Sequence, residues 1–186
     1  MDAVAIAHAL KAVIPGCGIE PLEAVDQPTV VVPAAQLVAV ATALRDVPDL
    51  RFTMPVDVVG VDFLPREPRF EVNYHLVSPD RAQPIRLRVK VRVAGTDPVL
   101  PTLVGVWPGC NFLEREVWDL LGIVFEGHPD LRRLLTPDDW EGHPLRKDYP
   151  VQVKLPVRTD EPLQLTPEQF RANIEKDCHT RGGSGA

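Results

Sequence analysis

The residues from Ile85 to Val93 alternate strictly between apolar and basic side chains, which constrains the fold more than any other feature of the chain. The apolar positions are Ile85, Leu87, Val89, Val91 and Val93, and the basic positions are Arg86, Arg88, Lys90 and Arg92. Successive side chains of a strand point to opposite faces, so this period of two predicts a strand with one apolar and one polar face. A strand of this kind is typical of an antiparallel sheet that buries one face.

A second run alternates in the same way and predicts a neighbouring strand. Its apolar positions are Phe70, Val72, Tyr74 and Leu76, and its polar positions are Glu71, Asn73 and His75. A third strand is expected from about 52 to 63, joined to the second by a hairpin over 64–69. Its apolar parity changes at Val58 and Val59, which predicts a bulge or burial on both faces.

Two amphipathic helices are expected before these strands. Asp2 can cap a helix whose apolar face holds Ile6, Leu10 and Val13. Pro33 fits the first turn of a second helix, and Pro48 closes it. The apolar face of that helix is Leu37, Val40, Ala41 and Leu44. The pattern predicts a two-layer α+β domain, with a mainly antiparallel or mixed sheet and helices on one face.

The C-terminal part of the chain reads differently. Pro150, Pro156, Pro162 and Pro167 interrupt any regular period, so the fold is expected to continue as an extended C-terminal arm. We therefore expect a domain over 1–150 and an extended, partly disordered tail over 151–186. Thr166 is expected to begin one short helix within that tail.

The segment Glu114–Pro150, called the signature segment below, has the composition of a docking surface. It holds 14 charged residues among 37, against 32 among the other 149 positions, together with two of the three Trp and two His-Pro pairs.

Its helix is predicted to begin at Asn111, with Glu114 completing a capping box, and to end at Gly122. Leu113, Val117, Leu120 and Leu121 would form its buried stripe, while Arg115, Glu116 and Asp119 would lie opposite, with Arg115 and Asp119 paired.

Motifs for cofactors and catalysis are weak. The three cysteines, Cys17, Cys110 and Cys178, lie far apart and fit a reducing compartment better than a disulfide framework. Cys110 is interpreted as packed, with a thiol of lowered pKa as the alternative. His128 and His143 would bind a metal only if the fold brought them together. Carboxylates of the signature segment alternate with Arg and Lys, which favours ion pairing over general acid/base catalysis.

The overall charge restricts the class of partner. A net charge of −6 argues against binding nucleic acid. The basic positions of 86–92 are interpreted as a solvated sheet face partly balanced by Glu71, with contact to an acidic protein as the alternative. No stretch reaches the ~18 apolar residues of a membrane span, and no signal peptide is evident.

The signature segment is similar to that of one family. Glu114, Arg115, Glu116 and Asp119, followed by His128-Pro129-Asp130-Leu131-Arg132-Arg133 and then 137–150, resemble the C-type subunit of respiratory complex I, the proton-pumping NADH:quinone oxidoreductase. The resemblance covers roughly residues 1–155. It implies a subunit of the hydrophilic arm, in the quinone-reducing module, peripheral at the cytoplasmic face of the inner (plasma) membrane.

The same resemblance implies partners and cofactors. The chain would dock on the D-type subunit, with the cluster-bearing B- and I-type subunits nearby, and would be part of an enzyme without supplying catalytic residues. It would bind no cofactor or metal itself, and FMN, iron–sulfur clusters and quinone would lie on other subunits. The alternatives are the equivalent subunit of a membrane-bound hydrogenase or of a dehydrogenase with another electron donor, an adaptor outside any redox complex, and a free-standing acid/base enzyme using Glu114, Asp119 and His128.

Interface candidates follow from residue type within the signature segment, because aromatic and Arg side chains dominate protein interfaces. They are Trp118, His128, Arg132, Arg133, Trp140, His143, Arg146, Lys147, Asp148 and Tyr149. The basic members are expected to pair with carboxylates of the partner or of this chain. Prolines between His128 and Pro150 are expected to hold this stretch extended across the partner.

Overall fold

The computed structural model describes residues 2–79, 84–150, 166 and 168–172. The chain divides into two compact units, Met1–Pro150 and Val151–Ala186. In the second unit, residues 168–172 are helical, and the backbone N–H of Gln169 donates to Thr166 Oγ1 at 3.3 Å. The short helix predicted to start at Thr166 is therefore present. The expected extended arm falls on residues outside those described.

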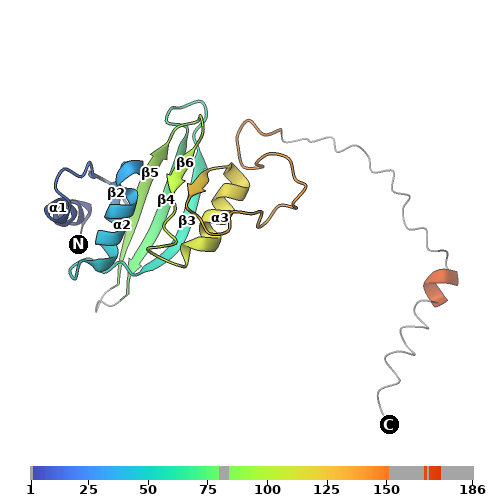
Figure 1. Ribbon diagram of the computed structural model, residues 1–186, viewed down its shortest axis with the longest axis horizontal. Coiled ribbons are helices and arrows are strands. Elements are labelled where there is room, and N and C mark those ends of the chain that lie inside the picture. Colours follow the sequence, from blue (N-terminus) through green and yellow to red (C-terminus); the bar gives the residue numbers. More distant parts are fainter. Residues whose placement is uncertain (1, 80–83, 151–165, 167, 173–186) are drawn as a thin grey trace, which may run out of the picture. The chain divides into compact units, whose positions relative to one another are not determined.

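A five-stranded mixed sheet forms the centre of the first unit (Figure 1). Its order is β1 (Glu20–Leu22), β2 (Thr29–Val31), β5 (Ile85–Val93), β4 (Phe70–Ser78) and β3 (Met54–Asp62). All neighbours are antiparallel except β2 and β5, which are parallel. The predicted two-layer α+β class and mixed sheet are confirmed, as is the β3–β4 hairpin.

The helices pack on the apolar face of this sheet. They are α1 (Ala3–Val13), α2 (Leu37–Asp46) with a preceding 3-10 turn at Ala34–Gln36, and α3 (Cys110–Leu121). All four predicted apolar residues of α2 are buried, and so are Phe70, Val72, Tyr74 and Leu76 of β4. Gly60 of β3 is paired with Val72 and faces Val117 and Leu121 of α3. α2 and α3 thus cover the same face, with α2 against β4 and β5 in the middle of the sheet and α3 against the edge strand β3.

Local details agree with the prediction in one place and differ in another. The register of β3 shifts between Pro55 and Asp57, close to the irregularity predicted near Val58. Val13 is exposed, although Ile6 and Leu10 on the same helix are fully buried, because it lies in the last turn of α1. The opposite sheet face carries the polar residues as predicted, and Lys90 is paired with Glu71 at 2.8 Å and Arg88 with Asp26. These pairs show that Lys90 and Arg88 are balanced by carboxylates of this chain, and Glu71 and Asn73 on this face are themselves buried.

A second, two-stranded sheet positions α3. β6 (Val99–Pro101) and β7 (Val124–Glu126) are parallel, and α3 lies between them in sequence. The sequence predicts neither strand, because three residues are too few to show a period. Parallel neighbours require a crossover connection, and α3 supplies it. α3 packs on β3 of the large sheet and contacts β7, and its other side faces the loop that follows β7.

The contact of Gly60 with α3 generates a test of this packing. A Cβ at Gly60 would overlap Leu121 Cδ1 and lie 3.0 Å from Val117 Cγ1. We expect Gly60→Ala to lower the free energy of unfolding by about 1–3 kcal/mol through overpacking, measured by urea denaturation. Gly105→Ala is the matched control, because nothing lies within 4 Å of its Cβ position. Equal stability of both variants would contradict the packing of α3 on β3.

Candidate functional site

One side of α3 is covered by the loop 127–150, which follows β7 and ends the first unit. Arg115 and Asp119 lie on that side and are only 6% and 0% exposed. The prediction that these two residues form a solvent-facing i,i+4 pair is therefore wrong. Each instead bonds to the loop, which folds back over the helix and buries both side chains.

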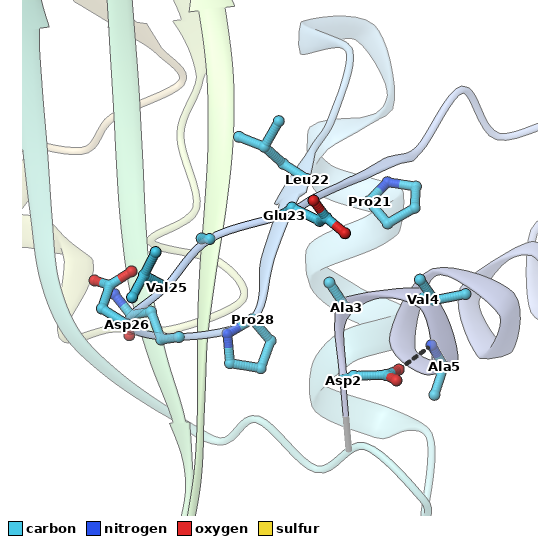
Figure 2. A pocket seen from close by; sticks show the side chains of 12 residues that line it. Asp2, Ala3, Val4, Ala5, Pro21, Leu22, Glu23, Val25, Asp26 and Pro28 are labelled. Atoms are coloured by element: carbon cyan, nitrogen blue, oxygen red, sulfur yellow. Dashed lines mark hydrogen bonds between the residues drawn. The ribbon is translucent and has the colours of Figure 1, made fainter.

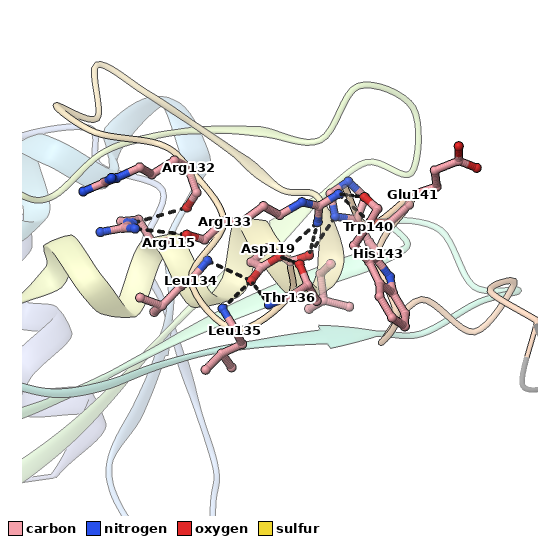
Figure 3. A network of polar contacts seen from close by, with 12 residues as sticks. Arg115, Asp119, Arg132, Arg133, Leu134, Leu135, Thr136, Trp140, Glu141 and His143 are labelled. Carbon is pink, nitrogen blue, oxygen red and sulfur yellow. Dashed lines mark hydrogen bonds and ion pairs between the residues drawn. The ribbon is translucent and has the colours of Figure 1, made fainter. Parts of the chain in front are cut away.

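Asp119 is the centre of this contact (Figure 3). Its carboxylate accepts hydrogen bonds from three consecutive backbone N–H groups, those of Leu134, Leu135 and Thr136, at 3.0, 2.7 and 2.9 Å. It also accepts from the Thr136 hydroxyl and forms an ion pair with Arg133 at 2.9 Å. Burial opposes ionisation of Asp119, but these hydrogen bonds outweigh it and hold the pKa of Asp119 well below its usual range.

The loop also satisfies the last carbonyl groups of α3, which have no partners within the helix. Asp119 O accepts from Arg133 and lies 2.9 Å from His143 Nδ1, and Leu120 O accepts from the backbone N–H of Leu145. Arg146 donates to Leu121 O and Gly122 O at 2.6 and 3.2 Å. Two guanidinium groups thus lie at the negative end of the helix dipole.

Gly122 ends the helix as predicted. Its φ of 72° is the left-handed conformation that glycine adopts readily, and its backbone N–H donates to Trp118 O. A side chain at this position would also collide with His143 and Arg146. Burial lowers the pKa of His143, so the ring is neutral near pH 7 and its Nδ1–H is the donor to Asp119 O.

The start of α3 differs from the predicted capping box. The helix begins at Cys110 with Gly109 as its N-cap, and no side chain caps it. Glu114 turns away from Asn111 and accepts hydrogen bonds from Thr102 Oγ1 and from the backbone N–H of Leu103, the latter at 2.8 Å. Burial raises the pKa of the Cys110 thiol to about 12, which excludes the alternative of a reactive thiolate there.

A second network fixes the far end of the loop to the β3–β4 hairpin. Arg69 forms ion pairs with Asp62 and Asp148, each at 2.7 Å. The backbone N–H of Lys147 donates to Asp62 at 2.9 Å, and its Nζ lies 3.5 Å from Leu64 O. The hydrogen bond from Arg69, assisted by those from the Lys147 and Leu64 backbone, holds the pKa of Asp62 well below its usual range although burial opposes this.

The aromatic candidates pack against other residues of the signature segment. Trp140 and Tyr149 stack with ring centroids 6.4 Å apart, and the Tyr149 hydroxyl donates to Glu141 O. Trp118 makes an edge contact with His143, and the Arg133 guanidinium lies over its ring at 5.5 Å. These rings are therefore partly used to order the loop itself.

The two histidines lie at opposite ends of α3. His128 Nε2 is 3.0 Å from Asn111 O, whereas His143 is bonded to Asp119 O, eight residues further along the helix. Eight residues of α-helix span about 12 Å, so the fold does not bring the two rings together around a metal. The described part of the chain contains no group of three or more His, Cys, Asp or Glu residues able to hold a metal ion.

The remaining predicted residues lie close to this surface. Arg115 donates to the carbonyl groups of Arg132 and Arg133, and its guanidinium lies over the Phe112 ring at 5.5 Å. The Arg132 side chain is bonded to Asp130 and is 72% exposed. Of the basic candidates, Arg133 and Arg146 are used inside the chain, while Arg132 and Lys147 extend toward solvent.

Sequence reasoning missed three exposed apolar side chains beside this network. Phe112, Leu135 and Leu145 are 62%, 61% and 58% exposed. Phe112 is on α3, while the backbone N–H groups of Leu135 and Leu145 are both bonded to that helix. A helical wheel could have identified Phe112, since it is one turn from Arg115 and Glu116. No periodic signal marks the two leucines, because their loop has no regular structure.

An open concavity lies elsewhere, between the first turn of α1 and the β1–β2 connection (Figure 2). Its lining includes Val4, Leu22 and Val25, with carboxylates at Asp2, Glu23 and Asp26. Asp2 caps α1 through Ala5 N at 2.8 Å and Asp26 is paired with Arg88, so two of its three acids are engaged within the chain. This concavity shows no cofactor or catalytic chemistry.

Among the described helices, none is long and apolar enough to cross a membrane.

The fold and the signature segment together define the class of protein, a two-layer α+β domain whose crossover helix is held by a charged C-terminal loop. A family model described as "Respiratory-chain NADH dehydrogenase, 30 Kd subunit" matches residues 30–154. The chain belongs to this family, the 30 kDa subunit of respiratory complex I.

Relatives agree over most of the chain. The C-type subunit of the NADH-quinone oxidoreductase of Roseiflexus sp. strain RS-1 is 46% identical over 151 residues, covering 81% of this chain and 86% of that protein. The corresponding subunit of Xanthobacter autotrophicus is 44% identical over 174 residues, covering 89% and 81%. The resemblance drawn from the signature segment is therefore confirmed at the level of the family.

Two solved structures share the fold. One is Nqo5, described as a trypsin-resistant fragment (1-134), with 38% identity, a TM-score of 0.56, and coverage of 70% of this chain and all of that one. The other belongs to a membrane-bound sulfane sulfur reductase, an archaeal respiratory membrane complex. It has a TM-score of 0.68 and covers 88% of this chain and 98% of that one, but at 23% identity it shows the fold alone.

The Asp119 network generates a prediction about the loop. Asp119→Asn removes the ion pair with Arg133 and leaves that largely buried guanidinium without its carboxylate, so we expect a loss of about 3 kcal/mol in the free energy of unfolding. The chain should also be cleaved faster by trypsin after Arg132 and Arg133. An amide has one acceptor oxygen where the carboxylate has two, so it cannot accept from both the 134–136 backbone and the Arg133 and Thr136 side chains. Asp139→Asn, at an exposed position of the same loop, is the control. Unchanged stability and cleavage in Asp119→Asn would refute the assignment of Asp119 as the residue that holds the loop.

Proposed function

We propose that this chain is a cofactor-free structural subunit of the hydrophilic arm of a proton-translocating NADH:quinone oxidoreductase, in the quinone-reducing module. It docks on the D-type subunit and lies near the cluster-bearing B- and I-type subunits. The chain itself is peripheral, at the cytoplasmic face of the inner (plasma) membrane, as part of a membrane complex. The observation that carries the proposal is the exposure of Phe112, Leu135 and Leu145 beside a segment whose buried charges are bonded within the chain.

The internal bonding of the signature segment supports docking through a preformed surface. Loop 127–150 is ordered by contacts within the chain, namely those of Asp119 and the Arg69–Asp148 pair. Because the loop is already ordered in the free subunit, association does not carry that entropy cost, and the same contacts give tighter binding. The prolines are not what keeps the loop in place in this proposal. Hydrogen bonds to the end of α3 do that.

Burial separates the residues of the segment that stabilise the fold from those that are available for docking. Arg133 and Arg146 hold α3 and the loop, so changing them alters folding as well as docking. Exposed apolar side chains contribute to binding because docking removes them from water. This stabilises the complex by about 25 cal/mol for each Å² of apolar surface buried. Arg132 and Lys147 reach solvent and supply charge at the rim, where ion pairs influence association rate and specificity. The rings of Trp118, Trp140 and Tyr149 support this surface by packing against other residues of the signature segment.

Redox chemistry belongs to other subunits in this proposal. FMN, the iron–sulfur clusters and quinone are bound elsewhere in the assembly, and the carboxylates of this chain act as structural acceptors. The alternative of a free-standing acid/base enzyme using Glu114, Asp119 and His128 is disfavoured by their separate roles, since Glu114 bonds to Thr102 and Asp119 to the loop. Turnover by the purified chain alone would support that alternative.

The electron donor of the parent complex is a separate question. Both relatives described above are named as subunits of NADH-quinone oxidoreductases, which favours NADH over hydrogen or another donor. Purification of the native assembly followed by mass spectrometry distinguishes these cases. Flavin- and NADH-binding subunits would support complex I, and a nickel-site large subunit would support a hydrogenase.

Docking is tested by placing a charge on the apolar surface. We expect Phe112→Asp, Leu135→Asp and Leu145→Asp each to weaken binding to the co-expressed D-type subunit at least tenfold, because an apolar hot-spot contact contributes about 2 kcal/mol. Binding is measured by affinity capture and by titration of the purified subunits. Thermal unfolding of each variant should match that of the unchanged chain, because all three side chains are exposed.

Val25→Asp is the matched control for this experiment. Val25 is fully exposed in the β1–β2 connection, away from the signature segment, so it receives the same change in a different place. If the three variants bind the D-type subunit as tightly as Val25→Asp does, the surface around Phe112, Leu135 and Leu145 is not the docking site.

A further inference from the structure

Glu114 is an acidic residue in the core, where acidic side chains are rarely found. It is 0% exposed and lies on the inner side of α3, within the apolar core. A carboxylate is strongly disfavoured in such a place unless a cation or several donors compensate it. Asp62 and Asp119 are also buried acids, and both are bonded to loop 127–150. Each has an arginine partner: Arg69 lies 2.7 Å from Asp62, and Arg133 lies 2.9 Å from Asp119.

The donors to Glu114 in the described part of the chain are neutral. They are the hydroxyl of Thr102 and the backbone N–H of Leu103, both in the connection between β6 and α3. The titratable groups that act on this region are Tyr74 from β4 and Cys110 from the first turn of α3. Burial raises the pKa of both, so both are neutral at physiological pH and neither stabilises a negative charge.

Tyr74 adds a second feature to this place. It is 1% exposed, and its hydroxyl has no hydrogen-bond partner among the described residues. An unpaired buried hydroxyl is costly, because burial removes its hydrogen bonds to water and nothing replaces them. Burial and the neighbouring Glu114 charge both raise the pKa of Tyr74.

We propose that Glu114 is a proton-binding site in the core, occupied when α3 is seated on the β6–α3 connection. The site takes up a proton from solvent when the chain folds and releases it when the chain unfolds. The protonated carboxyl fits an apolar core with two neutral donors, whereas the carboxylate requires further hydrogen bonds that only water or an opened Thr102–Leu103 segment can supply. Proton activity near neutrality thereby sets how firmly α3 is held. The site acts in this way whether or not the chain is docked to a partner.

The electrostatics of the site agree with this assignment. Burial raises the pKa of Glu114 to about 7, with the hydrogen bonds from Thr102 and Leu103 opposing the shift. In the unfolded chain the same group has a pKa of 4.5. A group whose pKa is raised by folding binds more protons in the native state between these two values, so stability falls as pH rises from about 4.5 to about 7 and then levels off.

A pH titration of the full chain tests the proposal directly. In the unchanged chain, the side-chain carboxyl carbon of Glu114, followed by NMR after assignment, should titrate with a midpoint between pH 6 and 8. The exposed Glu116 in the same helix provides the internal control. A Glu114 midpoint below pH 5 would overturn the proposal, and this measurement does not require any variant to fold.

Stability provides the second readout. From pH 5.5 to pH 8 the folding equilibrium constant of the unchanged chain should fall by roughly 25-fold more than that of Glu114→Gln, whose amide remains neutral. Gln can still accept from Leu103 N and donate to Thr102, so the variant retains the geometry. Glu116→Gln is the matched control and should keep the full pH dependence. The same pH dependence in Glu114→Gln as in the unchanged chain would mean that another group binds the proton.

Discussion

The bonding of the Asp119 carboxylate to loop 127–150 is the interaction on which the rest of the signature segment depends. A long stretch without regular secondary structure must satisfy its backbone groups in another way. Asp119 accepts three of them in succession, and Arg133, paired with the same carboxylate, reaches on to the carbonyl groups of Trp140 and Gly142 at 2.8 and 3.0 Å. One buried acid thus organises both arms of the loop around the end of α3.

The loop and the helix stabilise each other. α3 supplies the acceptors at its last turn, and His143, Leu145 and Arg146 occupy them. The helix is in turn held to the large sheet through Val117 and Leu121 against Gly60, and to the small sheet through its contact with β7. This arrangement explains how a highly charged segment can be ordered by its own contacts. Its buried charges neutralise one another and the helix dipole, and the side chains left exposed include the apolar Phe112, Leu135 and Leu145 as well as Arg132 and Lys147.

The two faces of α3 use carboxylates for different purposes. On the outer face, Asp119 is ionised because donors and an arginine surround it. On the inner face, Glu114 meets only two neutral donors and lies among apolar side chains. Acids five residues apart on one helix therefore have pKa values shifted in opposite directions, and the difference arises from what packs against each.

The sequence by itself determined the family and those helices and strands whose apolar pattern repeats over many residues. Alternation over 85–93 and 70–76, the apolar faces of α1 and α2, and Gly122 as the end of α3 were all readable, because local propensity and the pattern of burial agree there. The mixed two-layer class followed from them. Only the tertiary structure decided the roles of Glu114, Arg115 and Asp119. Helical spacing placed Arg115 and Asp119 in solvent, and a capping motif assigned Glu114 to Asn111. Their true partners, Thr102, Arg132 and the 134–136 backbone, come from loops without a period, and long-range contacts of that kind leave no trace in local sequence.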